Sequence, residues 1–307
     1  MTINWRLLFG PLAAVIAYFL CYQVAGLSTP ACIVAAITGL CASWWVLEPV
    51  PIPVTSLIPL ALLPLFDVLT SSQVAQAYGH PIILLLMAGC ILSTAMAHSG
   101  AHKKIALIML HICGEDSPKR VVLGFMLAAA LLSMWISNTA TTLMLLPVAL
   151  AVSSSANNSV FSIPLLLGIC YAASIGGMGT PIGTPPNLIL MRVYEEHSGE
   201  SISFLSWMLW CLPVVIIFIP IAWLWLTRHL KSPVTFTLPK KESWSIEQKR
   251  VLVVFALTAL AWITRTEPFG GWRSWLGLPN ANDASVAMIA VIAMFIVPAG
   301  NGKKLLN

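Results

Sequence analysis

The sequence predicts an all-α polytopic membrane protein, and three observations support this prediction. Of the 307 residues, 58% are hydrophobic and only 9% are charged, whereas a soluble domain carries about 25% charged residues. The mean hydropathy is +0.88. Several segments approach the roughly 20 apolar residues that a membrane-spanning helix needs, and two polar breaks interrupt such apolar sequence at 137–142 and 176–187.

Seven segments are candidates for membrane-spanning helices by their apolar length. They cover 7–26, 31–47, 52–69, 81–100, 205–227, 250–264 and 284–299. The third is rich in proline, with Pro51 directly before it and Pro53, Pro59 and Pro64 inside it. Because proline removes a backbone donor and clashes with the preceding turn, we expect this segment to be kinked or irregular.

The first polar break, at 137–142, reads Ser-Asn-Thr-Ala-Thr-Thr and lies inside the apolar stretch 121–152. This stretch is too long for one span and too short for two spans plus a turn. Lipid does not tolerate unpaired backbone, so a broken helix persists only where it lines a cavity or a binding site. We therefore predict a re-entrant hairpin of two half-helices with the polar hexapeptide at its tip.

The second polar break follows a helix predicted at 160–175. Glycine and proline interrupt the sequence from 176 to 186, and a short second helix is predicted at 187–194. The two breaks lie about 40 residues apart and are rich in hydroxyl, amide and carbonyl oxygen. Paired broken helices of this kind are typical of the ion and substrate sites of secondary transporters.

The distribution of basic residues predicts the orientation. With the N-terminus inside and the hairpin entering and leaving on the cytoplasmic side, 13 Lys and Arg fall inside, and Arg192, Arg265 and Arg273 fall outside. This is the bias expected of cytoplasmic loops. It also accounts for the net charge of +5 without a nucleic-acid-binding surface.

Ionisable residues are absent from the middle of the predicted spans, since all eleven acids fall in loops or at segment ends. This argues against a proton antiporter driven by a buried carboxylate. Carbonyl and hydroxyl oxygens can still bind Na⁺, and half-helix N-termini favour an anion. An isolated anion at this depth is expensive, so bound cations must neutralise it. The residues thus predict cation-coupled anion transport. They do not favour an enzyme, because no acid pair, metalloprotease motif or phosphate loop is present.

The motifs that carry this chemistry resemble those of the divalent anion/sodium symporter family (DASS). The resemblance rests on Leu-Ser-Met-Trp-Ile-Ser-Asn-Thr-Ala-Thr-Thr at 132–142 and Ser-Ile-Gly-Gly-Met-Gly-Thr-Pro-Ile-Gly-Thr-Pro-Pro-Asn-Leu-Ile at 174–189, with weaker similarity at 51–60, 89–96 and 101–106. It implies a multi-pass protein of the bacterial inner membrane that transports di- or tricarboxylates or sulfate with Na⁺, forms a homodimer and contains two inverted repeats, each with a hairpin and a broken helix.

The resemblance also implies roles for individual residues. Na⁺ would be held by Ser133, Ser137, Asn138 and a backbone carbonyl near Gly183, and a substrate carboxylate would contact Asn138 and Thr139. Thr184, Pro185 and Asn187 would support the site. The implied organisation is a scaffold at 1–119, a transport domain at 120–227, a cytoplasmic interfacial linker at 228–249 and the scaffold helices of an incomplete second repeat at 250–307.

The last implication concerns the extent of the chain. It ends after the segment that resembles the family's eighth span, so the second hairpin and second broken helix are missing. We expect Na⁺-coupled symport of a dicarboxylate such as succinate, malate or fumarate for the intact architecture, without an organic cofactor, and no transport by this chain alone. Three alternatives stay open: a non-transporting remnant or half-protein, a carboxylate exchanger, and a sulfate or oxyanion transporter.

Overall fold

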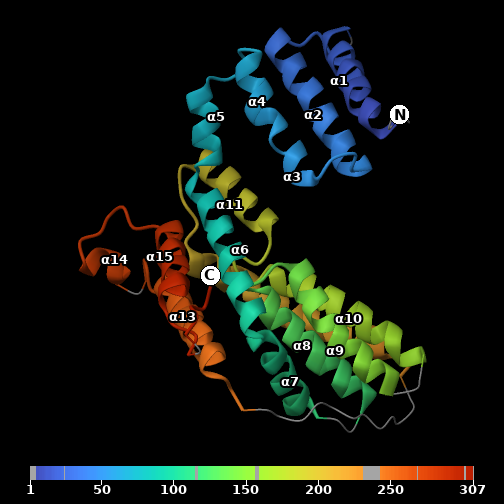
Figure 1. Cartoon of the computed structure of the whole chain (residues 1–307), viewed down its shortest axis with the longest axis vertical. Coiled ribbons are helices and arrows are strands. Elements are labelled where there is room, and N and C mark those ends of the chain that lie inside the picture. Colours follow the sequence, from blue (N-terminus) through green and yellow to red (C-terminus); the bar gives the residue numbers. More distant parts are fainter. Residues whose placement is uncertain are drawn as a thin grey trace. The chain divides into compact units, whose positions relative to one another are not determined.

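The computed structural model describes residues 5–23, 25–114, 117–155, 159–230, 243–267, 269–300 and 302–306. All regular elements within these ranges are helices (Figure 1), apart from one isolated bridge between Pro298 and Lys304. The chain divides into two compact units, Met1–His80 and Pro81–Asn307. The all-helical prediction is confirmed.

The first unit contains five helices. They are α1 (Trp5–Gln23), α2 (Thr29–Leu47), α3 (Ile52–Thr55), α4 (Ile58–Leu65) and α5 (Ser71–Tyr78). The Pro-rich segment predicted at 52–69 is broken into α3 and α4, with Pro51 at the N-cap of α3 and Pro64 inside α4. The expectation of an irregular segment is therefore confirmed.

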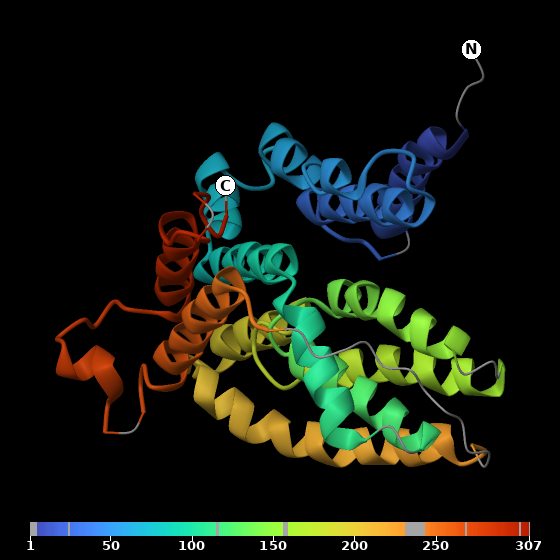
Figure 2. The ribbon, with the colours of Figure 1, turned by 60° about the horizontal axis from the view of Figure 1, so that its bottom comes forward.

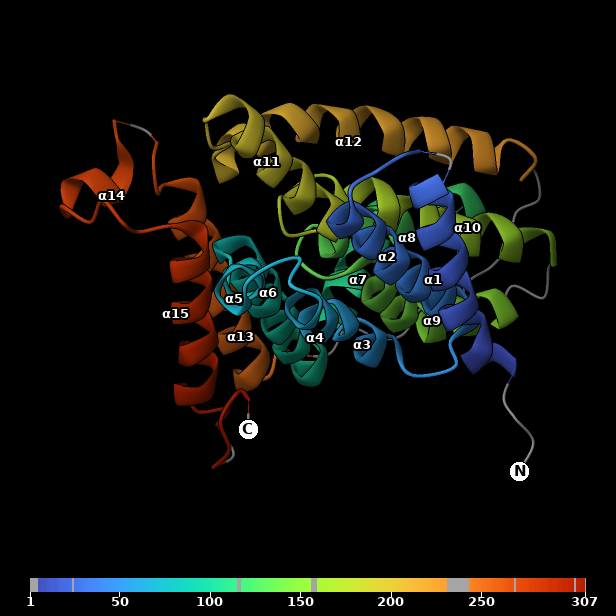
Figure 3. The same ribbon diagram turned by 90° about the horizontal axis from the view of Figure 1, so that it is seen from above.

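The second unit contains the remaining ten described helices. They are α6 (Pro81–Ser99), α7 (Ala101–Cys113), α8 (Pro118–Ser133), α9 (Asn138–Ser155), α10 (Ser159–Gly177), α11 (Pro185–Ser198), α12 (Phe204–Thr227), α13 (Ile246–Ile263), α14 (Gly271–Trp275) and α15 (Asp283–Ile296). Helices α13 and α15 pack against α6 (Figure 2). Helices α8, α9 and α10 lie side by side (Figure 3).

Five helices are long and apolar enough to cross a membrane: α1, α2, α6, α10 and α12. The spans predicted at 250–264 and 284–299 correspond to α13 and α15, which are not among the five. Helix α13 begins with the polar residues Glu247, Lys249 and Arg250. Helix α15 has 14 residues, because the chain becomes extended at Val297 and pairs back on itself.

Small residues allow α8 and α10 to approach closely. Ala128, Ala129 and Ala130 of α8 are buried, and a Cβ on Gly176 of α10 would lie against the Ala130 backbone. Close packing of small residues is how helices associate where lipid offers no hydrophobic drive. The core of the second unit therefore fixes the ends of α8 and α10, where both polar breaks begin.

The first break differs in detail from the prediction. The helical path is interrupted at 134–137 rather than at 137–142, and Asn138 already opens α9. The cause is Ser137, whose side-chain oxygen accepts a hydrogen bond from the Ala140 amide at 3.3 Å. Such a cap satisfies an otherwise unpaired donor and lets a helix resume.

The second break is also shorter than predicted. Gly176 and Gly177 remain helical at the end of α10, and α11 begins at Pro185 instead of residue 187 and continues to Ser198. Proline is well suited to the first helical turn, because its fixed φ matches the helix and its missing N–H would be unpaired there. The break is thus confined to 178–184.

The predicted domain boundaries separate parts by their expected roles in transport rather than by compactness. The compact units divide at 80/81, and the division at 119/120 between a scaffold and a moving part stays a prediction. Of the predicted linker at 228–249, residues 231–242 lie outside the described residues.

Candidate functional site

The two polar breaks meet in space. The Thr180 hydroxyl in the second break donates a hydrogen bond to the carbonyl oxygen of Met134 in the first. A Cβ placed on Gly183 would lie 2.9 Å from the carbonyl oxygen of Ser133 and against that of Gly177. Only glycine fits at position 183, because the backbones of both breaks converge there.

Ser133 and Asn138 form a polar pair across the first break. The Ser133 hydroxyl donates to Oδ1 of Asn138 at 2.6 Å and thus does not bond back to its own helix, which is the usual alternative for a helical serine. Ser133 is fully buried, whereas Asn138 is half-buried. A Cβ at position 177 would meet Oδ1 of Asn138, so a larger residue there would displace the Asn138 side chain.

Asn187 ties the second break together. Its buried side chain donates from Nδ2 to the carbonyl oxygen of Gly177 at 2.8 Å and to that of Thr180 at 2.9 Å. One amide group therefore joins the end of α10 to the start of α11. Thr184 is extended at the N-cap position, with no side-chain cap, and Pro185 follows it.

The helix ends around this junction have opposite polarity. Helices α8 and α10 end there at Ser133 and Gly177, while α9 and α11 begin there at Asn138 and Pro185. Helix C-termini carry partial negative charge and favour a cation, and N-termini carry partial positive charge and favour an anion. Four helix ends at one junction can hold both ions without a charged side chain.

The oxygen atoms at the junction fit a hard cation such as Na⁺. Within the described residues, no amide donates to the carbonyl oxygen of Ser133, although this residue is fully buried. A buried carbonyl without a partner is unfavourable unless water or an ion satisfies it. The carbonyl oxygen of Gly177 converges with it on Gly183, and the hydroxyl of the same serine is bonded to Oδ1 of Asn138. None of these groups titrates, so the charge of the cluster does not change with pH.

The predicted residues divide into two groups. Ser133, Asn138, Gly183 and Asn187 belong to one cluster of contacts. Ser137, directly before α9, and Thr139, on its first turn, are exposed. The side-chain oxygen of Ser137 accepts a hydrogen bond from the Ala140 amide.

Three residues of this region were not predicted. Thr180 links the two breaks and is fully buried. Its position within the glycine-rich stretch 176–183 is the feature of the sequence that could have identified it. Trp207 donates from Nε1 to the Met178 carbonyl oxygen at 2.9 Å, and nothing in the sequence marks this contact across 29 residues. The Thr141 hydroxyl is buried and has no hydrogen-bond partner among the described residues.

Aromatic stacking supports the first break from one side. The Trp135 ring is nearly parallel to that of Trp262, with centroids 6.4 Å apart, and Phe204 stacks on Trp262 at 5.0 Å. These rings come from the break, from α13 and from the start of α12. Trp135 therefore packs the tip of the α8–α9 pair against neighbouring helices.

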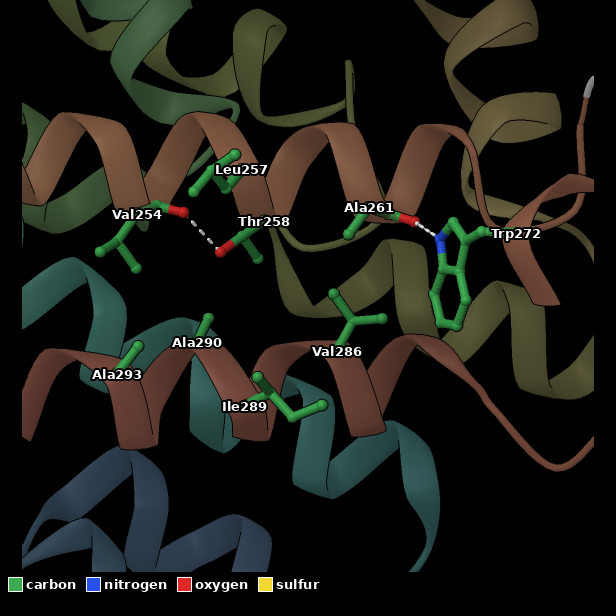
Figure 4. A pocket seen from close by; sticks show the side chains of 9 residues that line it. All are labelled: Val254, Leu257, Thr258, Ala261, Trp272, Val286, Ile289, Ala290 and Ala293. Atoms are coloured by element: carbon green, nitrogen blue, oxygen red, sulfur yellow. Dashed lines mark hydrogen bonds between the residues drawn. The ribbon is translucent and has the colours of Figure 1, made fainter. Parts of the chain in front are cut away.

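A separate cavity of about 430 Å³ lies between α13 and α15 (Figure 4). Its two polar side chains are already satisfied, since Thr258 donates to the Val254 carbonyl and Trp272 to the Ala261 carbonyl. The rest of the wall is hydrocarbon. This cavity offers no group that would compensate a buried anion, so the oxygen cluster at the two breaks is the better candidate site.

We expect Gly176→Ala to destabilise the protein by about 1–3 kcal/mol, as overpacking does. The new Cβ would lie 2.7 Å from the Ala130 carbonyl carbon, and the backbone there cannot yield without separating α8 from α10. Gly89→Ala in α6 is the matched control, because no atom lies within 4 Å of its Cβ position. Thermal unfolding in detergent measures both variants, and equal melting temperatures would contradict the packing argument.

Comparison with known proteins identifies relatives along most of the chain. Residues 42–298 match the family model described as citrate transporter, CitMHS. The sodium-dependent dicarboxylate transporter SdcS of Staphylococcus saprophyticus is 38% identical over 320 residues, which cover 97% of this chain and 61% of the relative. The protein of the same name from Staphylococcus aureus strain NCTC 8325 is 39% identical over 293 residues, covering 88% of this chain and 56% of the relative.

These matches confirm the resemblance found in the two motifs and place the chain in a transporter family rather than among enzymes. The chain spans little more than half the length of the curated relatives it matches. Since the family model covers most of its residues, the chain belongs to the CitMHS citrate transporter family.

Proposed function

We propose that this chain provides one half of the ion and substrate site of a Na⁺-coupled dicarboxylate symporter. The observation that carries the proposal is the junction of four helix ends, where the Ser133 hydroxyl donates to Oδ1 of Asn138 and the carbonyl oxygens of Ser133 and Gly177 converge on Gly183. Relatives named as sodium-dependent dicarboxylate transporters support the ion and the substrate class.

Asn138 is the residue that links the two ligands in this proposal. Its Oδ1 faces the Ser133 hydroxyl and contributes to Na⁺ binding, together with the Ser133 and Ser137 oxygens and a carbonyl near Gly183. Its NH₂ group donates to a substrate carboxylate, and the exposed hydroxyl of Thr139 donates beside it. Bound Na⁺ neutralises the dianion, which this site of uncharged residues does not do by itself.

Asn187 holds this arrangement in place. By joining Gly177 and Thr180 it fixes the carbonyls of the second break, while Thr184 and Pro185 set the start of α11. A site built on such fixed dipoles needs little reorganisation when an ion enters.

We further propose that α8 and α9 form a re-entrant hairpin. With 16 and 18 residues they extend about 24 and 27 Å at 1.5 Å per residue, less than the roughly 30 Å of the hydrocarbon core. The proposed orientation has a cytoplasmic N-terminus in the bacterial inner membrane, as the basic residues favour. The proposed assembly is a homodimer in which 120–227 moves against the scaffold.

The alternatives differ in what they require of the site. A carboxylate exchanger would work only with substrate on both sides of the membrane. A sulfate or oxyanion transporter would prefer a compact anion to an extended dicarboxylate. A non-transporting half-protein would bind Na⁺ at most. Only the last alternative predicts no activity after the rest of the relatives' length is supplied.

Transport assays distinguish these cases. We expect proteoliposomes with residues 1–307 alone to show no saturable uptake of radiolabelled succinate under an inward Na⁺ gradient. A joined chain, in which residues 1–307 are followed by the remaining part of the S. saprophyticus relative, is expected to restore it. The physical reason is that the relatives' activity belongs to chains of which this one covers 61% or less.

Four results of this assay would change the proposal. Robust uptake by residues 1–307 would show that one half-site suffices. Uptake only into succinate-loaded vesicles would favour exchange, and competition by sulfate but not by malate would favour an oxyanion. If a correctly inserted joined chain shows no uptake, the non-transporting half-protein becomes the favoured alternative.

A further inference from the structure

A second cavity in this unit combines an apolar wall with a cationic rim. It measures about 430 Å³ and lies between the start of α10 and the end of α12. Val160, Ile163 and Pro164 line one side, and Trp225, Leu226, Arg228, His229 and Leu230 line the other. Neither break of the candidate transport site contributes to it.

Two contacts hold the Arg228 side chain in place. Its guanidinium carbon lies 3.5 Å from the centroid of the Trp225 ring, and its Nε donates to Nε2 of His229 at 2.9 Å. Stacking on an aromatic face and a fixed fork of donors are the features that suit arginine to phosphate recognition. Among the described residues, neither Nη nitrogen of Arg228 has an acceptor, and no carboxylate pairs with it.

The cavity lies at the level where lipid headgroups are expected. Helix α12 has 24 apolar-rich residues, or about 36 Å at 1.5 Å per residue, which exceeds the roughly 30 Å hydrocarbon core. Arg228 caps its C-terminal end. Tryptophan and arginine at such an end are typical of the membrane interface.

Further basic residues gather at the same end. Nε1 of Trp223 donates to the Lys119 carbonyl oxygen at 2.8 Å, which brings the start of α8 beside the end of α12. Lys119 and the adjacent Arg120 therefore lie at the end of α12 that Arg228 caps. A basic pocket between membrane helices, open to the interface, is the type of site that binds anionic lipid headgroups.

We infer that this cavity is a binding site for an anionic phospholipid. The phosphate contacts the free donors of Arg228, and an acyl chain lies along Val160, Ile163 and Leu226. The charge of the rim selects an anionic headgroup over a zwitterionic one, and the apolar wall selects a lipid over a soluble phosphate. The site is independent of the proposed transport function.

Native mass spectrometry of detergent-purified residues 1–307 tests the inference. Phosphatidylglycerol and phosphatidylcholine with the same acyl chains are titrated separately. We expect phosphatidylglycerol to bind at least fivefold more tightly, and Arg228→Gln to remove most of this preference. Arg192→Gln is the matched control, because Arg192 lies in the middle of α11 and already pairs with Glu196 at 2.8 Å. This variant should keep the preference.

Two further arms identify the source of the phosphate. Ile163→Ser, at a side chain that is 65% exposed, should weaken phosphatidylglycerol binding without affecting folding. Glycerol 3-phosphate at the same concentration should not displace the lipid. Thermal melts check that each variant is folded, and Arg228→Lys, which keeps the charge but loses the stacked fork, should give an intermediate preference if Arg228→Gln unfolds.

The inference is overturned by any of three results: equal binding of the two lipids, an unchanged preference in folded Arg228→Gln or Arg228→Lys, or full displacement by glycerol 3-phosphate.

Discussion

Asn138→Asp is expected to reduce Na⁺-driven succinate uptake by the joined chain at least a hundredfold. The carboxylate would still accept a hydrogen bond from Ser133, so the Na⁺ side of the residue survives. The donor toward the substrate is lost, and a negative charge faces the dianion instead. Like charges about 4 Å apart repel by about 4 kcal/mol at an effective dielectric constant of 20, more than the roughly 2.7 kcal/mol that a hundredfold loss requires.

Two companion variants sharpen this test. Asn138→Ala removes both the oxygen that faces Na⁺ and the NH₂ group that faces the substrate, without adding charge. Succinate uptake should again be lost, but here the Na⁺ affinity should fall as well, whereas Asn138→Asp should keep it. Asn280→Asp is the matched control, since Asn280 is exposed in the loop after α14. Protein inserted in the vesicles is quantified in each case. Uptake by Asn138→Asp above a tenth of the parent level would exclude the bridging role.

The sequence predicts the structure best where long stretches consist almost entirely of apolar residues. Long apolar segments such as 205–227 correspond closely to helices, here α12, because burial in lipid leaves the backbone no alternative to internal hydrogen bonding. The two breaks were found for the same reason, since glycine, proline and clustered hydroxyl groups are unusual within such sequence. Fold class and the position of the candidate site could thus be predicted.

Helix ends were predicted less well, because single side chains decide them. Ser137 caps α9 and Pro185 starts α11, which shortened both breaks by a few residues. The contacts across the breaks could not be predicted from the sequence. The bonds from Thr180 to Met134 and from Trp207 to Met178 join residues 46 and 29 positions apart, and only the packing of α8 against α10 brings the breaks together.

The unpartnered Ser133 carbonyl illustrates the same limit. The motif draws attention to the serine hydroxyl, but which backbone oxygen lacks a partner depends on where α8 ends and on how Gly183 approaches it. The family resemblance implied ligand candidates residue by residue, including a backbone carbonyl near Gly183. The structure adds that the carbonyl oxygens of Ser133 and Gly177 converge there.

Asn187→Ala is expected to raise the Na⁺ concentration for half-maximal uptake by the joined chain about tenfold to a hundredfold. The Gly177 carbonyl oxygen has no other donor among the described residues, whereas that of Thr180 keeps the Gly183 amide at 3.3 Å. An orphaned buried carbonyl costs about 1–3 kcal/mol, and the carbonyls of the second break lose their common anchor.

The assay separates positioning from general damage. Asn187 does not contact the substrate in our proposal, so the maximal rate at saturating Na⁺ should change far less than the Na⁺ requirement. A second measurement uses the melting temperature of residues 1–307 when choline is replaced by Na⁺. Na⁺ should raise the melting temperature of the parent and of Asn280→Ala, because a ligand stabilises only the state that binds it. The increase should be smaller or absent for Asn187→Ala. An unchanged Na⁺ requirement in a folded Asn187→Ala variant would show that the bond to Gly177 stabilises the fold without shaping the ion site.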